Sequence, residues 1–335
     1  MLRNINAMIQ VEEIDIPPAD FLRDYCEDAQ FHSAFQKSKV PGFEIGYLLV
    51  KRDAERISVA PFFLYDYQLS LFFDNQLLKK LFGFLRLRAA FVGHPSADVG
   101  RIDGETSEEV LAAINNFLFT KSRLVVYKFF EQALPLHDFS TITGMPIPIL
   151  KIEPDYFSSF HGTKRRHLKR ELQLSEALHF KEVDHPASSA DIPLDEIYRL
   201  YLNSYNNSDL QFEKLNRDYF ANTLSISRYL LVYLNSELVG FAQWFHKNGH
   251  ICGKYLGMDY RKGNGFLYPA IMLQIIKIAI RDGFSSIDFG VSGYAAKKRL
   301  GCQLVPTWVY FRHANPAVNW LLGRLKFLAE PSEDC

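Results

Sequence analysis

The sequence predicts an α+β protein of two domains, and three observations support this prediction. Short β-rich segments alternate with segments of helical period along the chain. The length of 335 residues exceeds the usual domain length of roughly 100–200 residues. A proline-rich stretch without helical period, from Leu134 to Glu153, separates two regular regions. We therefore expect one domain over residues 1–150 and a second over 151–328.

In the first domain, residues 43–50 and 57–64 are rich in β-forming residues and flank the polar turn 51–56. This pattern predicts a β-hairpin. Residues 107–119 carry apolar side chains at helical spacing, and residues 123–130 read as the next strand. The first domain is thus expected to combine a sheet with at least one helix.

The second domain has a clearer pattern of elements. A meander is expected around the turn Asn248-Gly249, which is a strong hairpin signal. The dipeptide Asp282-Gly283 ends an apolar helical pattern, as glycine often does after a helix. The expected helices cover residues 163–177, 194–207, 216–227, 267–281 and 294–300, and the expected strands cover 229–234, 238–245, 251–258, 286–289 and 307–312.

Composition and charge narrow the class of ligand. The chain has 38 basic and 38 acidic residues and is 48% hydrophobic, which excludes a disordered or fibrous protein. Up to residue 150 there are 15 basic and 19 acidic residues, and after it 23 and 19, so the two halves carry net charges of −4 and +4. This excess is too small for a protein that binds DNA but suits a phosphorylated small molecule.

The four cysteines, at positions 26, 252, 302 and 335, form no CxxC pair, which favours a reducing compartment and a cytoplasmic protein. His246 and His250 flank a turn, but no third ligand follows at metal-binding spacing, so we expect no metal. The first residues lack the apolar region of a signal peptide, and no run of about 18 apolar residues occurs. We therefore expect no integral membrane span.

The expected strand 251–258, a glycine-bearing loop at 261–265 and the helix at 267–281 form a typical anion-binding arrangement. Backbone N–H groups at a helix N-terminus point at the anion, and the helix dipole favours negative charge there. A plain strand-turn-helix connection is the competing interpretation.

Residues 164–170 (Lys-Arg-Arg-His-Leu-Lys-Arg), 253–259 (Gly-Lys-Tyr-Leu-Gly-Met-Asp) and 275–301 carry a family resemblance. The last stretch includes Asp288-Phe289-Gly290 and Lys298-Arg299-Leu300-Gly301. Together with the order of the elements, these stretches resemble the GNAT-fold acyltransferases, in particular the FemAB-like branch of peptidoglycan-type N-acyl and aminoacyl transferases. The resemblance implies two GNAT-like domains, each with a mixed, mostly antiparallel sheet flanked by helices.

The resemblance also implies an acyl-CoA co-substrate on the second domain and an acceptor site toward the first, in the cleft between them. The chain departs from the usual acyl-CoA signature at Tyr260, where the superfamily has Gln or Arg, although both glycines of the signature are in register. The implied donor-binding residues are Gly257, Met258, Arg261, Lys262, Gly263, Asn264 and Gly265.

Direct attack of an amine on an activated acyl group requires a base, donors for the oxyanion and an acid. Strand N–H groups around Leu256–Met258 are implied carbonyl donors. Asp259 is a candidate to position or deprotonate the amine, or else a turn residue. Tyr255 is a candidate acid, or else a core residue. Lys298 matches the functional lysine of the family, or else belongs to a solvated basic turn.

Four residues are candidates for binding the acceptor, and each has a simpler alternative. His94 and Asp98 lie in a loop similar to one that lines the acceptor cleft in FemAB-like first domains. Asp288 ends a predicted central strand, where ligand-facing residues collect, but can also cap a turn. Arg166 belongs to a basic helix that binds a phosphorylated acceptor or faces water. Residues 77–88 are basic and apolar, which fits peripheral membrane contact or a core helix.

These observations together predict an N-acyltransferase that moves an acyl group from acyl-CoA, or another thioester, to an amine of a small molecule or cell-envelope precursor. An aminoacyl-tRNA-dependent transferase of the FemAB-like type is the first alternative, with tRNA as a partner. A GNAT fold that only binds its ligand is the second alternative, and the departure at Tyr260 supports it.

Overall fold

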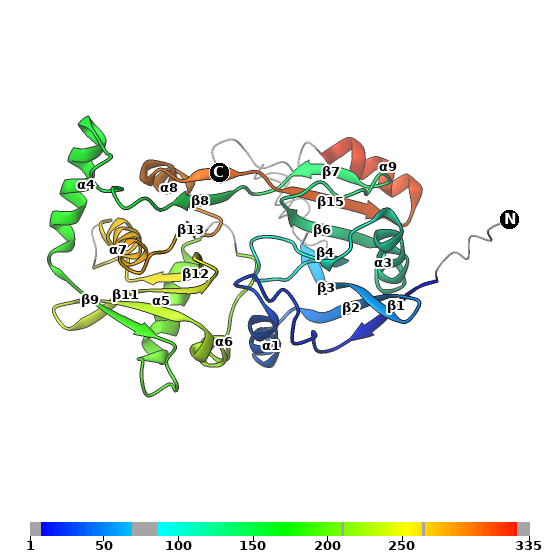
Figure 1. Ribbon diagram of the computed structural model, residues 1–335, viewed down its shortest axis with the longest axis horizontal. Coiled ribbons are helices and arrows are strands. Elements are labelled where there is room, and N and C mark those ends of the chain that lie inside the picture. Colours follow the sequence, from blue (N-terminus) through cyan, green and yellow to red (C-terminus); the bar gives the residue numbers. More distant parts are fainter. Residues whose placement is uncertain (1–7, 69–85, 209–210, 263–264, 327–335) are drawn as a thin grey trace. The chain divides into compact units, whose positions relative to one another are not determined.

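A computed structural model of the chain describes residues 8–68, 86–208, 211–262 and 265–326. The chain divides into two compact units, each built around its own sheet (Figure 1). The first unit comprises residues 1–21, 42–147 and 305–335, and the second comprises residues 22–41 and 148–304. The chain passes from the first unit to the second after residue 147, close to the boundary expected at 150. A single boundary there would place residues 22–41 in the first unit and residues 305–335 in the second. In the structure, residues 22–41 belong to the second unit and residues 305–335 to the first.

The first unit is a mixed sheet in the order β1-β2-β3-β4-β6-β15-β7, with β5 paired to β3. Only the pair β4 and β6 is parallel among its described pairs, and helix α3 lies in the connection between these two strands. The strands are β1 (Ile9–Ile14), β2 (Glu44–Arg52), β3 (Glu55–Gln68), β4 (Arg86–Val92), β5 (Asp103–Gly104), β6 (Leu124–Phe130), β7 (Ser140–Thr143) and β15 (Trp308–His313), and the described helices are α3 (Glu108–Lys121) and α9 (Pro316–Leu325).

The predicted elements of the first unit are confirmed, with one difference in the hairpin. The connection between β2 and β3 is the two-residue turn Asp53-Ala54, with both residues at positive φ, because two-residue turns of this hand match the strand twist. Helix α3 buries Val110, Ile114 and Leu118 against the sheet, as its apolar period predicts. Residues 77–85 of the predicted basic-apolar stretch lie outside the described residues, and Arg86–Arg88 begin β4.

The second unit is a sheet in the order β14-β8-β13-β12-β11-β10-β9, and its described pair β12 and β13 is parallel. Its strands are β8 (Ile147–Lys151), β9 (Leu178–Asp184), β10 (Arg228–Leu234), β11 (Glu237–Lys247), β12 (His250–Met258), β13 (Ser286–Asp288) and β14 (Gln303–Val305). Its helices are α1 (Ala29–Lys37), α4 (Gly162–Ser175), α5 (Leu194–Asn206), α6 (Arg217–Asn222), a 3-10 turn at Leu224–Ile226, α7 (Leu267–Arg281) and α8 (Tyr294–Leu300).

Helices cover both faces of this second sheet (Figure 1). On one face the apolar residues of α7 form a core with Ile251 and Met258 of β12, and α4 packs on α7. On the other face α5 packs on β11 and β12, and α6 joins α5 to α1. The amide of Asn216 donates to the carbonyl oxygen of Ser38 (2.6 Å), which fastens α1 to the N-terminus of α6. Residues 22–41 therefore complete the second unit.

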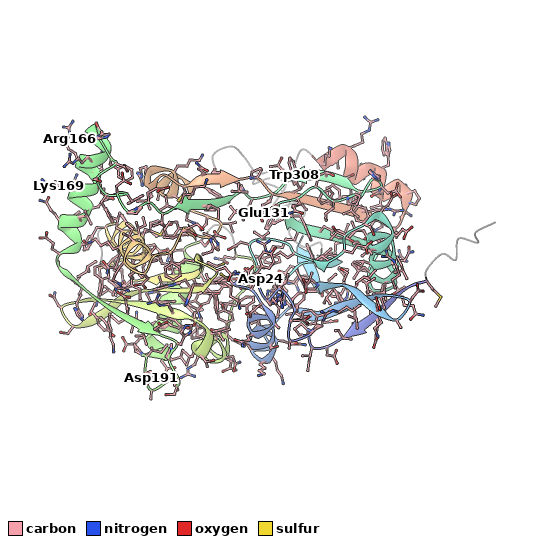
Figure 2. All side chains as sticks on the ribbon, viewed as in Figure 1. Asp24, Glu131, Arg166, Lys169, Asp191 and Trp308 are labelled. Atoms are coloured by element: carbon pink, nitrogen blue, oxygen red, sulfur yellow. The ribbon has the colours of Figure 1, made fainter. Side chains whose placement is uncertain are left out.

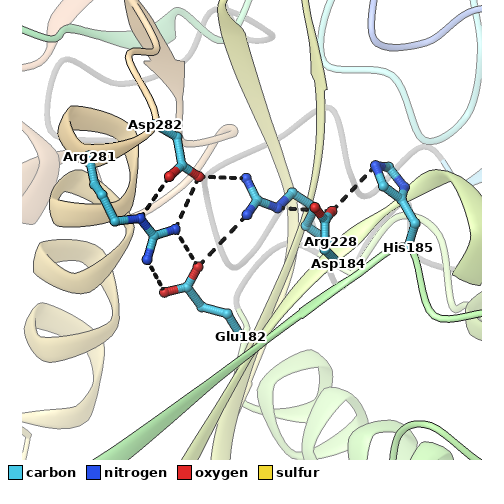
Figure 3. Close-up of polar contacts among 6 residues, drawn as sticks. All are labelled: Glu182, Asp184, His185, Arg228, Arg281 and Asp282. Carbon is cyan, nitrogen blue, oxygen red and sulfur yellow. Dashed lines mark hydrogen bonds and ion pairs between the residues drawn. The ribbon is translucent and has the colours of Figure 1, made fainter.

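An ion network fastens the edge strand β9 to β10 and to the end of α7 (Figure 3). The guanidinium of Arg228, whose side chain is 11% exposed, contacts Asp184 (3.0 Å), Asp282 (2.9 Å) and Glu182 (3.8 Å). Arg281 binds Glu182 through two 2.7 Å hydrogen bonds. The hydrogen bond from Arg281 lowers the pKa of the Asp282 carboxyl, against the opposite effect of burial.

We expect Arg228→Met to lower the free energy of unfolding by about 2 kcal/mol at pH 7, because three carboxylates lose their shared cation in a partly buried site. A lowered pKa in the folded state stabilises the protein above the unfolded-state pKa, and this stabilisation is lost as the pH falls through the folded-state pKa. The difference between variant and wild type should therefore shrink toward about pH 3, where carboxyls begin to be protonated.

Urea unfolding at both pH values measures this effect. Arg217→Met is the matched control, because its ion pair with Asp195 is exposed and screened by solvent, so its loss should change the stability much less. Equal losses in the two variants, or a loss from Arg228→Met that does not depend on pH, would contradict the assigned role of the network.

Candidate functional site

The two parallel strands β12 and β13 separate in the middle of the second sheet. They pair only over His250–Cys252 and Ser286–Asp288. Beyond this point the N–H of Phe289 donates to the carbonyl oxygen of Pro148 on β8 (3.3 Å), so the chain leaves β12, which runs on to Met258. In the described part of the chain no strand pairs with this edge of β12 after Cys252. The sheet is therefore open at its centre.

Backbone N–H groups of β12 point into this opening. The N–H of Asp259 donates to Val239 of β11 (2.8 Å), so alternation along the strand directs the N–H groups of Met258 and Leu256 to the opposite, open edge. The N–H of Met258 indeed donates to the hydroxyl oxygen of Ser204 on α5 (3.2 Å). Leu256 thus presents its N–H at the open edge, where the sequence predicted carbonyl donors.

A β-bulge sets the direction of these groups. Gly253 pairs with Trp244 of β11 and Tyr255 pairs with Gln243, so Lys254 is an extra residue in β12. A bulge of one residue exchanges both faces and both edges for every residue that follows it, because the strand repeat is two. The insertion of Lys254 therefore decides which atoms face the opening.

The loop that follows β12 is organised by Asp259. Its carboxylate accepts hydrogen bonds from the backbone N–H of Arg261 (3.1 Å) and from the guanidinium of the same residue (3.2 Å). These hydrogen bonds lower the pKa of Asp259, whose side chain is 3% exposed, whereas the Arg261 side chain is 82% exposed. A carboxylate held in this way is a weak base at neutral pH, so the geometry favours the turn role for Asp259.

The same loop leads to the N-terminus of α7. Lys262 donates its N–H to the carbonyl oxygen of Asp259 (3.1 Å), and its ammonium pairs with Glu237. Gly265 has a φ of +79°, and Gly263 and Asn264 lie outside the described residues. The first turn of α7, from Leu267 onward, contains no acidic side chain. A helix N-terminus beside exposed cations is electrostatically suited to phosphate groups.

Tyr255 lies on the α5 face of β12, within a cluster of aromatic rings. Its ring meets Tyr201 and Tyr219 edge to face, with centroids 5.7 and 5.3 Å apart. Its hydroxyl donates to the carboxylate of Glu213 (3.0 Å), which lies in the loop before α6. The half-buried Tyr255 thus combines the core role and the polar role that the sequence left open, and Glu213 joins the candidate residues.

Gly257 has a packing role that the sequence did not indicate. A Cβ atom at this position would lie 2.3 Å from the ring of Phe241 and 2.7 Å from the backbone nitrogen of Tyr201. Glycine is therefore required for α5 to approach β12. The side chain of the next residue, Met258, points to the opposite face and belongs to the core under α7.

The end of β13 and the helix that follows it carry three polar residues of interest. Asp288 is the last residue of β13, and Lys297 and Lys298 lie on α8. The buried Asp288 accepts a hydrogen bond from the N–H of Gly290 (2.7 Å), as a turn-capping residue does. Lys298 is exposed on α8, whereas its neighbour Lys297 is buried and donates to the carbonyl oxygens of Phe289 (2.9 Å) and Gly290 (2.5 Å). Lys297 therefore holds the loop that turns away from β12.

The remaining candidate residues lie on α4 of the second unit and in a loop of the first unit. Figure 2 shows Arg166 and Lys169 on α4, directed away from the sheet of the second unit, and both are exposed. In the first unit His94 is buried, and its Nδ1 accepts from the N–H of Ser96 (3.2 Å). The ammonium of Lys128 donates to the carbonyl oxygens of Pro95 and Ala97, and so supports the loop that also carries the half-buried Asp98.

Comparison with known proteins identifies the second unit. Residues 162–298 match the acetyltransferase (GNAT) domain family. The second unit contains a GNAT domain. The match covers strands β9–β13 and helices α4–α7, and so includes the opening between β12 and β13, the bulge and the loop before α7. The predicted GNAT resemblance is confirmed.

Solved structures show the same fold over most of the chain. FemX is 12% identical at a TM-score of 0.57, over 93% of this chain and 100% of FemX. The C-terminal domain of a lysylphosphatidylglycerol synthetase from Agrobacterium fabrum is 11% identical at a TM-score of 0.55, over 79% of this chain and 83% of that domain.

A tandem GNAT protein from the clavulanic acid biosynthesis pathway is 8% identical at a TM-score of 0.51, over 92% of this chain and 99% of that protein. No curated protein matches this chain in sequence. The predicted fold of two GNAT-like domains is confirmed, and the chain has a GNAT-type acyltransferase fold like that of FemX.

Two further findings concern metals and membranes. Among the described residues, no group of three or more His, Cys, Asp or Glu side chains is placed to hold a metal ion. The ring of His246 lies 5.4 Å from the ring of His185, which directly follows β9. No described helix is long and apolar enough to cross a membrane.

We expect Gly257→Ala to lower the free energy of unfolding by about 2 kcal/mol or more, because a methyl group there overlaps the backbone of α5. Chemical denaturation measures this loss. Gly265→Ala is the matched control: its Cβ would meet no described atom within 4 Å, so only the positive φ should cost about 1 kcal/mol. A Gly257→Ala variant of wild-type stability that has lost only ligand affinity would assign Gly257 to ligand binding instead.

Proposed function

We propose that the protein is an N-acyltransferase that moves an acyl group from acyl-CoA, or a related thioester, to an amine. The observation that carries the proposal is the opening between β12 and β13 inside a GNAT domain, with the N–H of Leu256 at its edge and a cationic loop at its end. Strand N–H groups fixed by a sheet suit an acyl carbonyl, because they require no reorganisation as the oxyanion develops.

In this proposal the loop after β12 binds the phosphate groups of the donor. Arg261 and Lys262 supply positive charge, and Gly263, Asn264 and Gly265 lead into the N-terminus of α7. Asp259 acts by fixing Arg261 and the turn, rather than as the base. The exposed Lys298 adds positive charge from α8. The charges of Arg261 and Lys262 and the glycine positions in the sequence fit coenzyme A, although Tyr260 replaces the usual Gln or Arg.

Tyr255 and Glu213 are the proposed proton carriers. The amine nitrogen attacks the thioester carbon, the C–N bond forms and the C–S bond breaks. Glu213 takes the proton that the amine loses, and the Tyr255 hydroxyl gives its proton to the thiolate of the leaving group. The hydrogen bond between Tyr255 and Glu213 then returns a proton to the phenolate, so the pair ends in its starting state.

We propose a small-molecule amine or a cell-envelope precursor as the acceptor, with Asp288, Arg166, His94 and Asp98 as candidate binding residues. Structural neighbours named FemX and lysylphosphatidylglycerol synthetase support a precursor or lipid-linked acceptor, and therefore peripheral membrane contact. The described cysteines, Cys26, Cys252 and Cys302, are free thiols, which supports a reducing compartment such as the cytoplasm.

An aminoacyl-tRNA donor is the alternative that one observation favours. Helix α4 exposes the basic residues Arg165, Arg166, Lys169 and Arg170, and a basic exposed helix suits a polyanion. The same departure at Tyr260 weakens the coenzyme A signature. A protein with a GNAT fold that only binds its ligand would have the same opening between β12 and β13, but it would not need Tyr255 as a proton carrier.

A thermal-shift titration with acetyl-CoA, a long-chain acyl-CoA and free coenzyme A tests the donor class. A ligand at about 100 times its dissociation constant adds roughly 2.7 kcal/mol to folded-state stability, so we expect a saturable rise in melting temperature with at least one of the three. No shift with any of them would contradict a coenzyme A donor and favour the aminoacyl-tRNA alternative.

We expect Tyr255→Phe to lower kcat by about 10²-fold while KM for the thioester changes little, because the variant keeps the ring and loses only the proton carrier. Steady-state kinetics with the thioester found in the titration measures this effect. Lys298→Ala is the comparison, because an exposed lysine that contacts phosphate should mainly raise KM. Unchanged kcat in Tyr255→Phe would exclude Tyr255 as the acid.

A further inference from the structure

A buried ion pair holds the bulge residue of β12. The ammonium of Lys254 pairs with the carboxylate of Glu27, and the two side chains are only 2% and 9% exposed. The same ammonium lies 5.3 Å from the centre of the Phe31 ring. Glu27 immediately precedes the N-cap residue of α1, so a segment 227 residues away in sequence fixes the one inserted residue of this strand.

The surroundings of Lys254 make Glu27 its counterion. His32 is buried beside it, and burial together with the Lys254 charge lowers the pKa of His32 to about 3, so the imidazole is neutral at physiological pH. Tyr219 is also fully buried nearby. A buried lysine in such surroundings is tolerated only with an ionised partner, because an unpaired buried charge is strongly destabilising. The pair therefore fixes the position of the Lys254 side chain.

This position has a geometric consequence for the donor site. Bulges increase local twist and change the phase of a strand. With Lys254 in the bulge, the N–H of Leu256 faces the open edge and the Tyr255 side chain faces α5. If β12 relaxed into regular pairing with β11, both would exchange sides. The residues proposed to polarise the carbonyl and to carry the proton would then leave the site together.

We infer that Glu27 and Lys254 are positioning residues for acyl transfer: their buried ion pair locks the bulge that directs the Leu256 N–H and the Tyr255 hydroxyl. This inference rests on the proposed function for its catalytic consequence, but the effect on the strand is independent of it. A purely structural ion pair would stabilise the unit without affecting the geometry of residues 253–256.

The variants Lys254→Met, Glu27→Gln and the double variant Glu27→Met with Lys254→Met separate these two roles. Each single variant removes one charge of the buried pair and should be less stable than wild type. The double variant should recover much of the lost stability, because both charges are removed. We expect all three to show slower hydrogen exchange at the Leu256 amide, because in regular pairing this N–H turns from the open edge to β11 and becomes hydrogen-bonded. We also expect about tenfold or greater loss of kcat/KM.

Lys247→Met is the matched control. Lys247 lies at the end of β11 and pairs with Asp28 of the same N-terminal segment (2.9 Å), but it lies away from the bulge. It should change exchange at Leu256 and kcat/KM by less than about twofold. Equal effects in Lys247→Met and Lys254→Met would overturn the inference, because loosening of the segment alone would then explain both.

Recovery of both stability and kcat/KM in the double variant would also overturn the inference that the ion pair positions the site.

The proposed function and the inference about the ion pair fail in different ways. If the wild type neither binds nor uses any thioester, the proposed function fails, and hydrogen exchange at Leu256 still decides whether the ion pair locks the bulge. If single variants do not fold, the double variant and the control supply the comparison.

Discussion

The insertion of Lys254 into β12 is the constraint on which the rest of the site depends. A β-strand alternates with a period of two, so a single extra residue exchanges its faces and edges from that point on. Before the bulge β12 pairs with β13, and after it the strand presents the N–H of Leu256 to an opening. The one inserted residue in the backbone of β12 therefore determines which groups face the site, and the side chains act within that arrangement.

This constraint explains why the second unit includes residues 22–41. The bulge residue carries a charge into the core, and the carboxylate that neutralises it comes from Glu27 before α1. The chain then leaves this unit, builds the first sheet and returns at residue 148. Closing a loop of this length costs little more entropy than closing a shorter one, because the cost rises only with the logarithm of length. A discontinuous unit is therefore a thermodynamically reasonable way to bring a distant carboxylate to a strand.

Periodic elements could be predicted from the sequence, and distant pairings could not. Helix α7 has the predicted bounds because its apolar period ends at Asp282-Gly283, and Gly283 adopts the expected positive φ. The sequence predicts the last strand close to its observed position. It does not predict the pairing of this strand with β6 and β7, because no local signal states which sheet a strand joins. Lys254 lies in the predicted strand 251–258, but Glu27 is 227 residues away and no local signal pairs the two.

At the site itself, the family resemblance located the elements more accurately than the individual residues. The Lys-x-x-Gly pattern selects Lys298, yet packing buries its neighbour Lys297 against two carbonyl oxygens of the preceding loop. Adjacent residues on a helix differ by about 100° in direction, so a pattern cannot show which of two lysines faces inward. Only the path of the loop after β13 decides this.

Gly257 shows why packing and function are not separate constraints in this strand. Its missing side chain lets α5 lie against β12, and the same approach brings Tyr201 onto the Tyr255 ring and the Ser204 hydroxyl onto the N–H of Met258. A larger residue there would push α5 outward and move both contacts. The family pattern marks Gly257 for ligand binding, but this glycine shapes the site through the packing of α5. The bulge at Lys254 places Gly257 on the α5 face of the strand.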